Sequence, residues 1–129
     1  MTLPFYFASI HHDGSARYVQ PQDPTLGDKV TLRLRAAPSA PIQRVLLRSD
    51  DDGEGYFLPL SPEDSQPAAP ARWWRLELTL KMPVTHYRFL LFTDDDAWWY
   101  NGGGLHEHTP TDAEDFRLLA DFEAPPVGA

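Results

Sequence analysis

Residues 87–105 read Tyr-Arg-Phe-Leu-Leu-Phe-Thr-Asp-Asp-Asp-Ala-Trp-Trp-Tyr-Asn-Gly-Gly-Gly-Leu, which is the pattern of a β-hairpin. Apolar residues alternate up to an acidic turn at residues 94–96, and the returning strand carries Trp98, Trp99 and Tyr100 before three glycines. Because side chains alternate across a sheet, three adjacent aromatics cannot all face one core. At least one of these rings therefore faces water, another domain or a ligand.

The same two-residue alternation recurs along the chain, whereas no window sustains the apolar spacing of an amphipathic helix. Residues 29–35 place three apolar side chains on one face and charged side chains on the other. Residues 42–49 are expected to bury Val45 and Leu47 in the same way. Both segments are therefore predicted to be half-buried strands.

Residues 72–81 are the clearest strand, and their alternation leaves Trp73 on the polar face. The apolar face of this strand carries Trp74, Leu76, Leu78 and Leu80. In the hairpin, alternation leaves Leu90 and Phe92 on the outer face when the core takes Tyr87, Phe89 and Leu91.

Short strands about ten residues apart, separated by turns rich in proline and glycine, are typical of an all-β fold. We therefore predict an immunoglobulin-like β-sandwich of about seven to eight antiparallel strands over residues 1–122. A last strand is expected at residues 116–122. Residues 123–129 read Glu-Ala-Pro-Pro-Val-Gly-Ala, which is the composition of a linker.

Length and composition fit a single domain of 129 residues with its own core. The chain has no cysteine, which excludes disulfides, thiolate metal ligands and cysteine nucleophiles. The N-terminal segment lacks the basic start and apolar run of a signal peptide, and no window is long and apolar enough for a membrane span, so we expect a cytoplasmic protein. The net charge of −8 and the scattered basic residues argue against a nucleic-acid partner.

Two histidine clusters and two acidic turns invite a metal interpretation. Residues 11–13 read His-His-Asp and residues 106–108 read His-Glu-His, but each would need a further ligand from elsewhere in the fold. Residues 50–54 and 94–96 supply the oxygen ligands that calcium favours, without the twelve-residue loop that would make the match specific. We therefore predict solvated histidines and ordinary turns, no metal site and no cofactor, with calcium as the alternative.

No motif of a known catalytic centre occurs in the sequence. It has no Gly-x-Ser-x-Gly elbow, no phosphate-binding loop and no dinucleotide fingerprint. Paired carboxylates for glycoside hydrolysis would need a deep cleft, which a small sandwich seldom provides. We therefore predict that this chain has no catalytic residues.

The aromatic residues are the remaining functional candidates. A sugar ring presents a face of C–H groups that stacks on indole or phenol rings, and its hydroxyls bond nearby polar groups. Trp74 is expected in the core because its face is otherwise all leucine, and Trp99 is also expected to pack inward. The predicted carbohydrate-binding residues are Trp98, Tyr100, Trp73 and Asn101. A protein contact at the same surface is the alternative.

The order of several motifs resembles one known family. They are His11, residues 28–35, residues 43–48 with their acidic turn, residues 73–78, residues 87–92, Trp98-Trp-Tyr-Asn-Gly102 and Asp121-Phe-Glu-Ala-Pro125. Together they resemble the N-terminal domain of neopullulanase-like and maltogenic-amylase-like enzymes of glycoside hydrolase family 13. This domain is classed as carbohydrate-binding module family 34.

The resemblance implies an immunoglobulin-like sandwich that precedes a catalytic (α/β)8 barrel, with residues 123–129 leading toward a barrel that this chain lacks. It implies a non-catalytic accessory domain whose partners are α-glucans (maltooligosaccharide, starch, pullulan or cyclodextrin), the barrel, and a second subunit. The alternative is a structural domain for homodimerisation and barrel docking, without sugar binding of its own. Leu90, Phe92 and the loop at residues 102–108 would suit such contacts.

Overall fold

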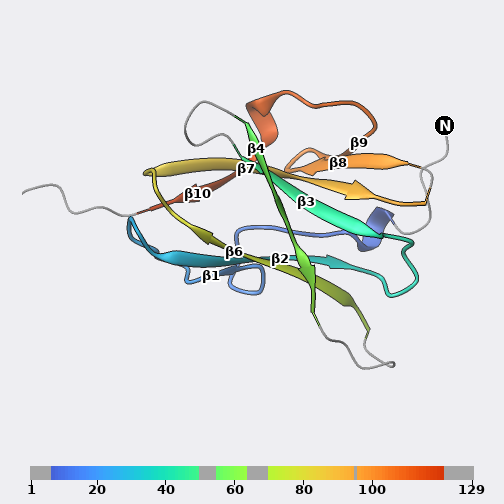
Figure 1. The fold of residues 1–129 in the computed structure, drawn as a ribbon, viewed down its shortest axis with the longest axis horizontal. Coiled ribbons are helices and arrows are strands. Elements are labelled where there is room, and N and C mark those ends of the chain that lie inside the picture. Colours follow the sequence, from blue (N-terminus) through green and yellow to red (C-terminus); the bar gives the residue numbers. More distant parts are fainter. Residues whose placement is uncertain (1–6, 50–54, 64–69, 95, 121–129) are drawn as a thin grey trace, which may run out of the picture.

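Two antiparallel β-sheets packed face to face make up the protein (Figure 1). The computed structural model describes residues 7–49, 55–63, 70–94 and 96–120. The small sheet has the order β1 (Val19–Gln20), β2 (Lys29–Ala36), β6 (Arg72–Thr79) and β5 (Ser61–Pro62). The large sheet has the order β4 (Tyr56–Pro59), β3 (Arg44–Ser49), β7 (Val84–Phe92), β8 (Ala97–Asn101) and β9 (Gly104–His106), and β10 (Phe116–Leu119) also pairs with β7.

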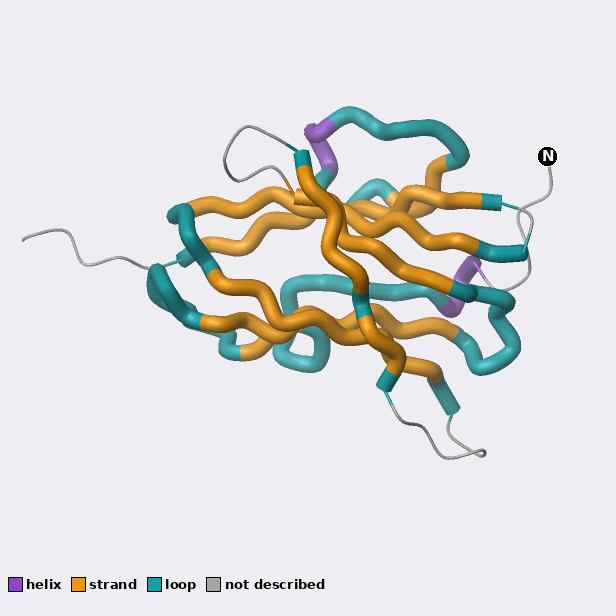
Figure 2. The backbone as a smooth tube through the Cα atoms, viewed as in Figure 1, coloured by secondary structure: helices purple, strands orange, loops and turns teal. Residues whose placement is uncertain are grey.

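This architecture confirms the predicted all-β sandwich. The described residues form ten strands, more than the seven to eight expected, because β1, β5 and β9 are only two or three residues long. Among the described residues, the helical segments are the short 3-10 helices η1 (Phe7–Ser9) and η2 (Asp112–Glu114), which are purple in Figure 2. Within the described segments, no helix has the length and apolar character needed to cross a bilayer. The boundary predicted between residues 122 and 123, and the linker after it, lie outside the described residues.

The chain changes sheets at Leu60. Strand β4 pairs with β3 in the large sheet, and β5, which follows after one residue, pairs with β6 in the small sheet. Leu60 is buried between them and donates its backbone N–H to the carbonyl oxygen of Val45 over 2.9 Å. Such a crossing closes one side of a sandwich without a separate connection.

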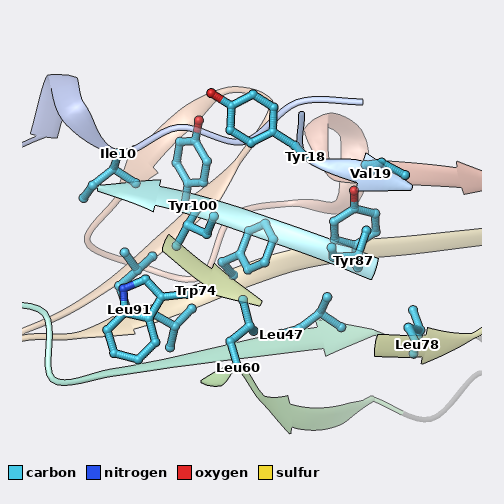
Figure 3. Close-up of a cluster of buried hydrophobic side chains, with 14 of the residues drawn as sticks. Ile10, Tyr18, Val19, Leu47, Leu60, Trp74, Leu78, Tyr87, Leu91 and Tyr100 are labelled. Atoms are coloured by element: carbon cyan, nitrogen blue, oxygen red, sulfur yellow. The ribbon is translucent and has the colours of Figure 1, made fainter. Parts of the chain in front are cut away.

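Each sheet contributes its alternate apolar side chains to one core (Figure 3). The predicted inward residues of β2 and β3 are buried, as are Trp74 on β6 and the three hairpin residues assigned to the core. Trp73 lies half-exposed on the opposite face of β6, which confirms the face predicted for it. Leu90 and Phe92 lie half-buried on the outer face of the large sheet, also as predicted.

The prediction that Trp98 and Tyr100 face outward is wrong. Both side chains are buried, with 6% and 8% of their surface exposed, whereas Trp99 is only half-buried. The cause is the register of the hairpin, in which Phe92 pairs with Ala97 across the four residues 93–96. Hairpin register follows loop length, and a shift by one residue exchanges the two faces of a strand.

In this register the aromatic residues of β8 face the core residues of β7. Trp98 pairs with Leu91 and Tyr100 pairs with Phe89, so all four share the inner face. Trp99 pairs with Leu90 and shares the outer face with it. The hairpin therefore buries two rings of its aromatic cluster and leaves the middle ring outside.

A histidine is built into this aromatic core. His12 is 2% exposed, and its Nδ1 lies 2.6 Å from the carbonyl oxygen of Arg33, to which it donates. Its Nε2 lies 2.6 Å from the Tyr87 hydroxyl, and this nitrogen therefore accepts a hydrogen bond. Its backbone N–H donates to the Tyr100 hydroxyl over 3.2 Å. Burial lowers the pKa of His12 to about 4, so the imidazole is neutral at pH 7.

Acidification should destabilise the fold through His12. Its folded pKa of about 4 lies below the ordinary histidine pKa of 6.5, so the unfolded chain binds the extra proton first. The contribution of His12 to the free energy of unfolding is complete above pH 6.5 and falls by about 3 kcal/mol down to pH 4. Urea denaturation at several pH values measures this loss. His12→Gln should flatten the dependence in this window, and an unchanged slope in that variant would contradict the assignment.

Core burial predicts a contrast between two phenylalanines of the large sheet. Phe89 is fully buried, whereas Phe57 is 49% exposed. Phe89→Ala should lower the free energy of unfolding by about 3–5 kcal/mol, because the large cavity it leaves cannot be refilled. Phe57→Ala, the matched control, should change it by less than about 1 kcal/mol. Denaturation curves of the two variants decide this, and similar losses would show that the core is assigned wrongly.

Candidate functional site

A hollow of about 490 Å³ opens at the β8–β9 edge of the sandwich. Its volume lies within the range of about 300–1,000 Å³ that is common for small-molecule sites. Apolar atoms come from three side chains, Trp98, Leu105 and Pro110, and polar groups from four, His106, Glu107, His108 and Thr109. The hollow thus combines an apolar wall with hydrogen-bonding groups on a single stretch of chain after β8.

Glycines allow the chain to turn from β8 into β9 beneath a second segment. Gly104 has φ of +103°, which side chains rarely tolerate. Gly102 donates its N–H to the carbonyl oxygen of Glu114 over 2.7 Å, and a methyl group on Gly102 would lie 2.7 Å from that same oxygen. Gly102 therefore lets η2 approach the turn between β8 and β9 closely.

Asn101 organises the turn from within. Its Oδ1 accepts hydrogen bonds from the Gly103 N–H over 2.9 Å and from Nε2 of His106 over 3.0 Å. Its Nδ2 donates to Oδ1 of Asp115 over 3.4 Å. Asn101 is 2% exposed, so it is a positioning residue that orients the His106 ring at the hollow.

A buried ion pair holds the loop that follows β9. Nη1 of Arg88 lies 3.6 Å from Oδ1 of Asp115, and each side chain is 4% exposed. Arg88 also donates from Nη1 to the carbonyl oxygen of Pro110 over 2.8 Å. Because Arg88 is on the outer face of β7, these contacts fasten the loop with Thr109 and Pro110 against the sheet. A buried pair of this kind is costly to break, since the remaining charge has no compensation.

The structure does not gather the four predicted sugar-binding residues into one site. Trp98 lines the hollow with the little surface it exposes, and Asn101 adjoins it through His106. Tyr100 is in the core, where its hydroxyl accepts the hydrogen bond from His12. Trp73 lies on the small sheet, away from the hollow.

Trp73 is surrounded by side chains from the small sheet and from the residues next to its strands. The guanidinium carbon of Arg33 lies 4.0 Å from the ring centre, and that of Arg17 lies at 5.7 Å. The Tyr18 ring packs against it with a centroid distance of 5.5 Å. Arg33 is also held by Glu63, with Nε to Oε2 at 2.7 Å and Nη2 to Oε1 at 3.0 Å. One face of the Trp73 ring is thus occupied by a fixed cation.

The histidine and acidic clusters do not form a metal centre among the residues that the structure describes. Within those residues no group of three histidine, aspartate or glutamate side chains is close enough to hold an ion. Residues 50–54, one of the two acidic turns considered for calcium, lie outside the described part of the chain.

The sequence indicates metal binding or protein contacts for residues 106–108, but it carries no signal for the apolar residues beside them in the hollow. Leu105, Thr109 and Pro110 carry no chemical motif, and they reach the hollow only because β9 pairs with β8 and the following loop is pinned by Arg88. The four-residue hairpin loop was the signal that could have placed Trp98 on the same side as Leu105.

Comparison with known proteins relates the fold to two enzymes. No protein-family model and no curated protein matches the sequence. The chain is similar to a solved cyclomaltodextrinase, with a TM-score of 0.73 and 16% identity over 90% of this chain and 20% of that chain. It is also similar to a maltogenic amylase from S. marinus, with a TM-score of 0.64 and 15% identity over 93% of this chain and 15% of that chain. The chain therefore shares a fold with one fifth or less of the length of these enzymes.

The glycine turn predicts a specific loss on substitution. Gly102→Ala should lower the free energy of unfolding by about 1–3 kcal/mol, because its methyl group meets the Glu114 backbone rather than a movable side chain. Gly14→Ala is the matched control, since nothing lies within 4 Å of that position. Urea denaturation gives both values, and amide shifts of His106 report on the turn. Equal stability of the two variants would refute the close approach.

Proposed function

We propose that the chain is a non-catalytic accessory domain of an enzyme that acts on α-glucan, and that it contacts glucan at the β8–β9 hollow. The observation that supports this most is the similarity in fold over 90% of the chain to a fifth of a cyclomaltodextrinase. By its name, that protein acts on cyclomaltodextrin, a ring of glucose units. The order of motifs in the sequence points to the same family of enzymes and to carbohydrate-binding module family 34.

The chemistry of the hollow suits a sugar. Glucose offers C–H groups to an apolar wall and hydroxyls to polar side chains, and the hollow has both kinds of lining. His106 is the best-oriented polar group, because Asn101 accepts its Nε2–H and leaves Nδ1 as an acceptor. Glu107 and His108 are exposed and can bond further hydroxyls.

Two of the four residues predicted from the sequence to bind carbohydrate keep a role at the hollow, and two do not. Trp98 remains a contact through its exposed edge, and Asn101 acts by positioning His106. Tyr100 supports the core instead, and Trp73 belongs to a different surface. With no exposed ring for face-to-face stacking in the hollow, affinity should be modest, with a dissociation constant between about 0.1 and 10 mM.

In such an enzyme this domain would be attached to a catalytic (α/β)8 barrel. The barrel would then carry all the catalytic residues of the enzyme. The alternative to glucan binding is a purely structural role, in docking on the barrel or in homodimerisation. A response to sugar at the hollow separates the two.

Titration of the 129-residue chain with maltoheptaose or β-cyclodextrin tests the proposal. Tryptophan fluorescence and amide chemical shifts should change at Trp98, Leu105 and His106, with at least half-saturation at about 10 mM sugar.

The double variant His106→Ala with His108→Ala should weaken binding at least about fivefold, since it removes the polar groups on one side of the hollow. His86→Ala is the matched control, because His86 is exposed on β7 and does not line the hollow. No response to either sugar at about 10 mM, or an equal loss in the control, would overturn glucan binding here.

A further inference from the structure

The outer face of the large sheet carries a row of mainly apolar side chains where a solvent-facing sheet should be polar. One row of side chains in register crosses five strands on this face, because each residue pairs with the next. The row consists of Pro59, Leu46, Leu90, Trp99 and His106. The neighbouring rows add Phe92 and Phe57, and the far end of β7 adds the pair Val84 and Leu119.

The described chain covers this face around Arg88, where the loop after β9 is held, but it leaves other apolar side chains of the face exposed. Phe57, Val84 and Leu119 are 49%, 42% and 64% exposed, and they are three of the five exposed large apolar side chains among the described residues. In an antiparallel sandwich, apolar residues that face the core alternate along each strand with polar residues that face water. Contiguous apolar positions there are typical of a contact surface.

The outer face of the small sheet is the natural comparison for the outer face of the large sheet. The small sheet's outer face pairs Lys29 with Thr79, Thr31 with Glu77, Arg33 with Arg75 and Arg35 with Trp73. All of these side chains except Trp73 are polar or charged, and the guanidinium of Arg33 lies over the Trp73 ring. The same chain thus follows the rule for a solvated face on one sheet and breaks it on the other.

The charges on the outer face of the large sheet indicate the kind of partner. The chain has a net charge of −8, yet none of the described strand residues directed to this face is acidic. Arg44 and Arg48 flank the apolar row, and Arg44 lies over the Phe92 ring at 4.8 Å. Aromatic and arginine side chains together are the residues most enriched at protein interfaces.

We propose that this face is a docking surface for a protein partner whose apolar centre is rimmed by carboxylates. Its defining residues are Leu46, Leu90, Phe57, Arg44 and Arg48. A second copy in symmetric contact through the same face would bring together two surfaces whose strand residues include arginine and no acid, and like charges oppose such a contact, so a second copy is not the occupant we propose. The docking surface stands whether or not the hollow binds glucan.

A glucan is a poorer occupant of this face. Stacking needs a free ring face, and guanidinium groups already lie against two of the three rings here, Arg88 at 5.1 Å from the centre of Trp99 and Arg44 at 4.8 Å from that of Phe92. Phe57 is 49% exposed, so a single ring is left for stacking. Leu46, Leu90 and Pro59 at the centre offer no hydrogen bonds to hydroxyls. A branched aliphatic centre with a cationic rim favours a folded protein surface over a sugar.

The probe is an amphipathic helical peptide of about 14 residues with leucine and phenylalanine on one face and glutamate beside them. A second peptide replaces each glutamate with lysine. Titration of the 129-residue chain, followed by amide chemical shifts, should show the acidic peptide binding at least about tenfold more tightly. The shifts should map to β3, β4 and β7 rather than to the hollow.

Two variants sharpen the test. Arg44→Glu with Arg48→Glu should reverse the preference between the peptides, whereas Lys29→Glu with Arg75→Glu on the small sheet, an equal change in charge, should keep it. Leu46→Ser with Leu90→Ser should abolish binding of the acidic peptide. The reversal of charge tests the proposal by itself if the serine variant fails to fold.

Several results would overturn the proposal. They are affinities for the two peptides within about twofold, no binding up to about 5 mM, or shifts confined to the hollow. Sedimentation as a dimer that the Arg44 and Arg48 changes disrupt would assign the face to a second copy. Shifts of Phe57 and Trp99 on addition of maltoheptaose would assign it to glucan.

Discussion

The register of the β7–β8 hairpin is the constraint on which the other features depend. A loop of four residues pairs Phe92 with Ala97, and the Thr93 N–H closes it by donating to the Asp96 carbonyl oxygen over 2.8 Å. This pairing sends Trp98 and Tyr100 into the core and Trp99 outward. A loop one residue shorter or longer would exchange these faces, because the side-chain period of a strand is two.

Two sets of buried polar contacts, one in the core and one at the β8–β9 edge, stabilise the structure around the hairpin. In the core, neutral His12 joins the carbonyl of Arg33 to the hydroxyl of Tyr87, so it ties the small sheet to the large one. At the edge, Asn101 and Arg88 both bind the segment around Asp115 and hold the loop after β9. Buried polar groups of this kind specify one geometry, since each loses its hydrogen bonds in any other.

The two candidate surfaces follow from the same pairing but differ in chemistry. The hollow lies at a sheet edge, where β9 and its loop bring polar side chains beside a small apolar wall. The docking surface lies on a sheet face, where leucine and aromatic side chains form a row with arginine at its margin. His106 ends this row and also lines the hollow, so a partner on the face and a ligand in the hollow would be neighbours.

Alternation along the chain was sufficient to predict the strands, the sandwich, the burial of Trp74 and the outward positions of Trp73, Leu90 and Phe92. These properties are local, because a period of two within one strand separates its faces wherever the strand lies. Alternation could not decide which face of β8 is inside, since all three of its aromatics suit either side. Strand pairing decided that, and it also assembled the hollow from residues without a motif and the apolar row from five separate strands. Neighbours across a sheet are far apart in sequence, so only the tertiary structure brings them into contact.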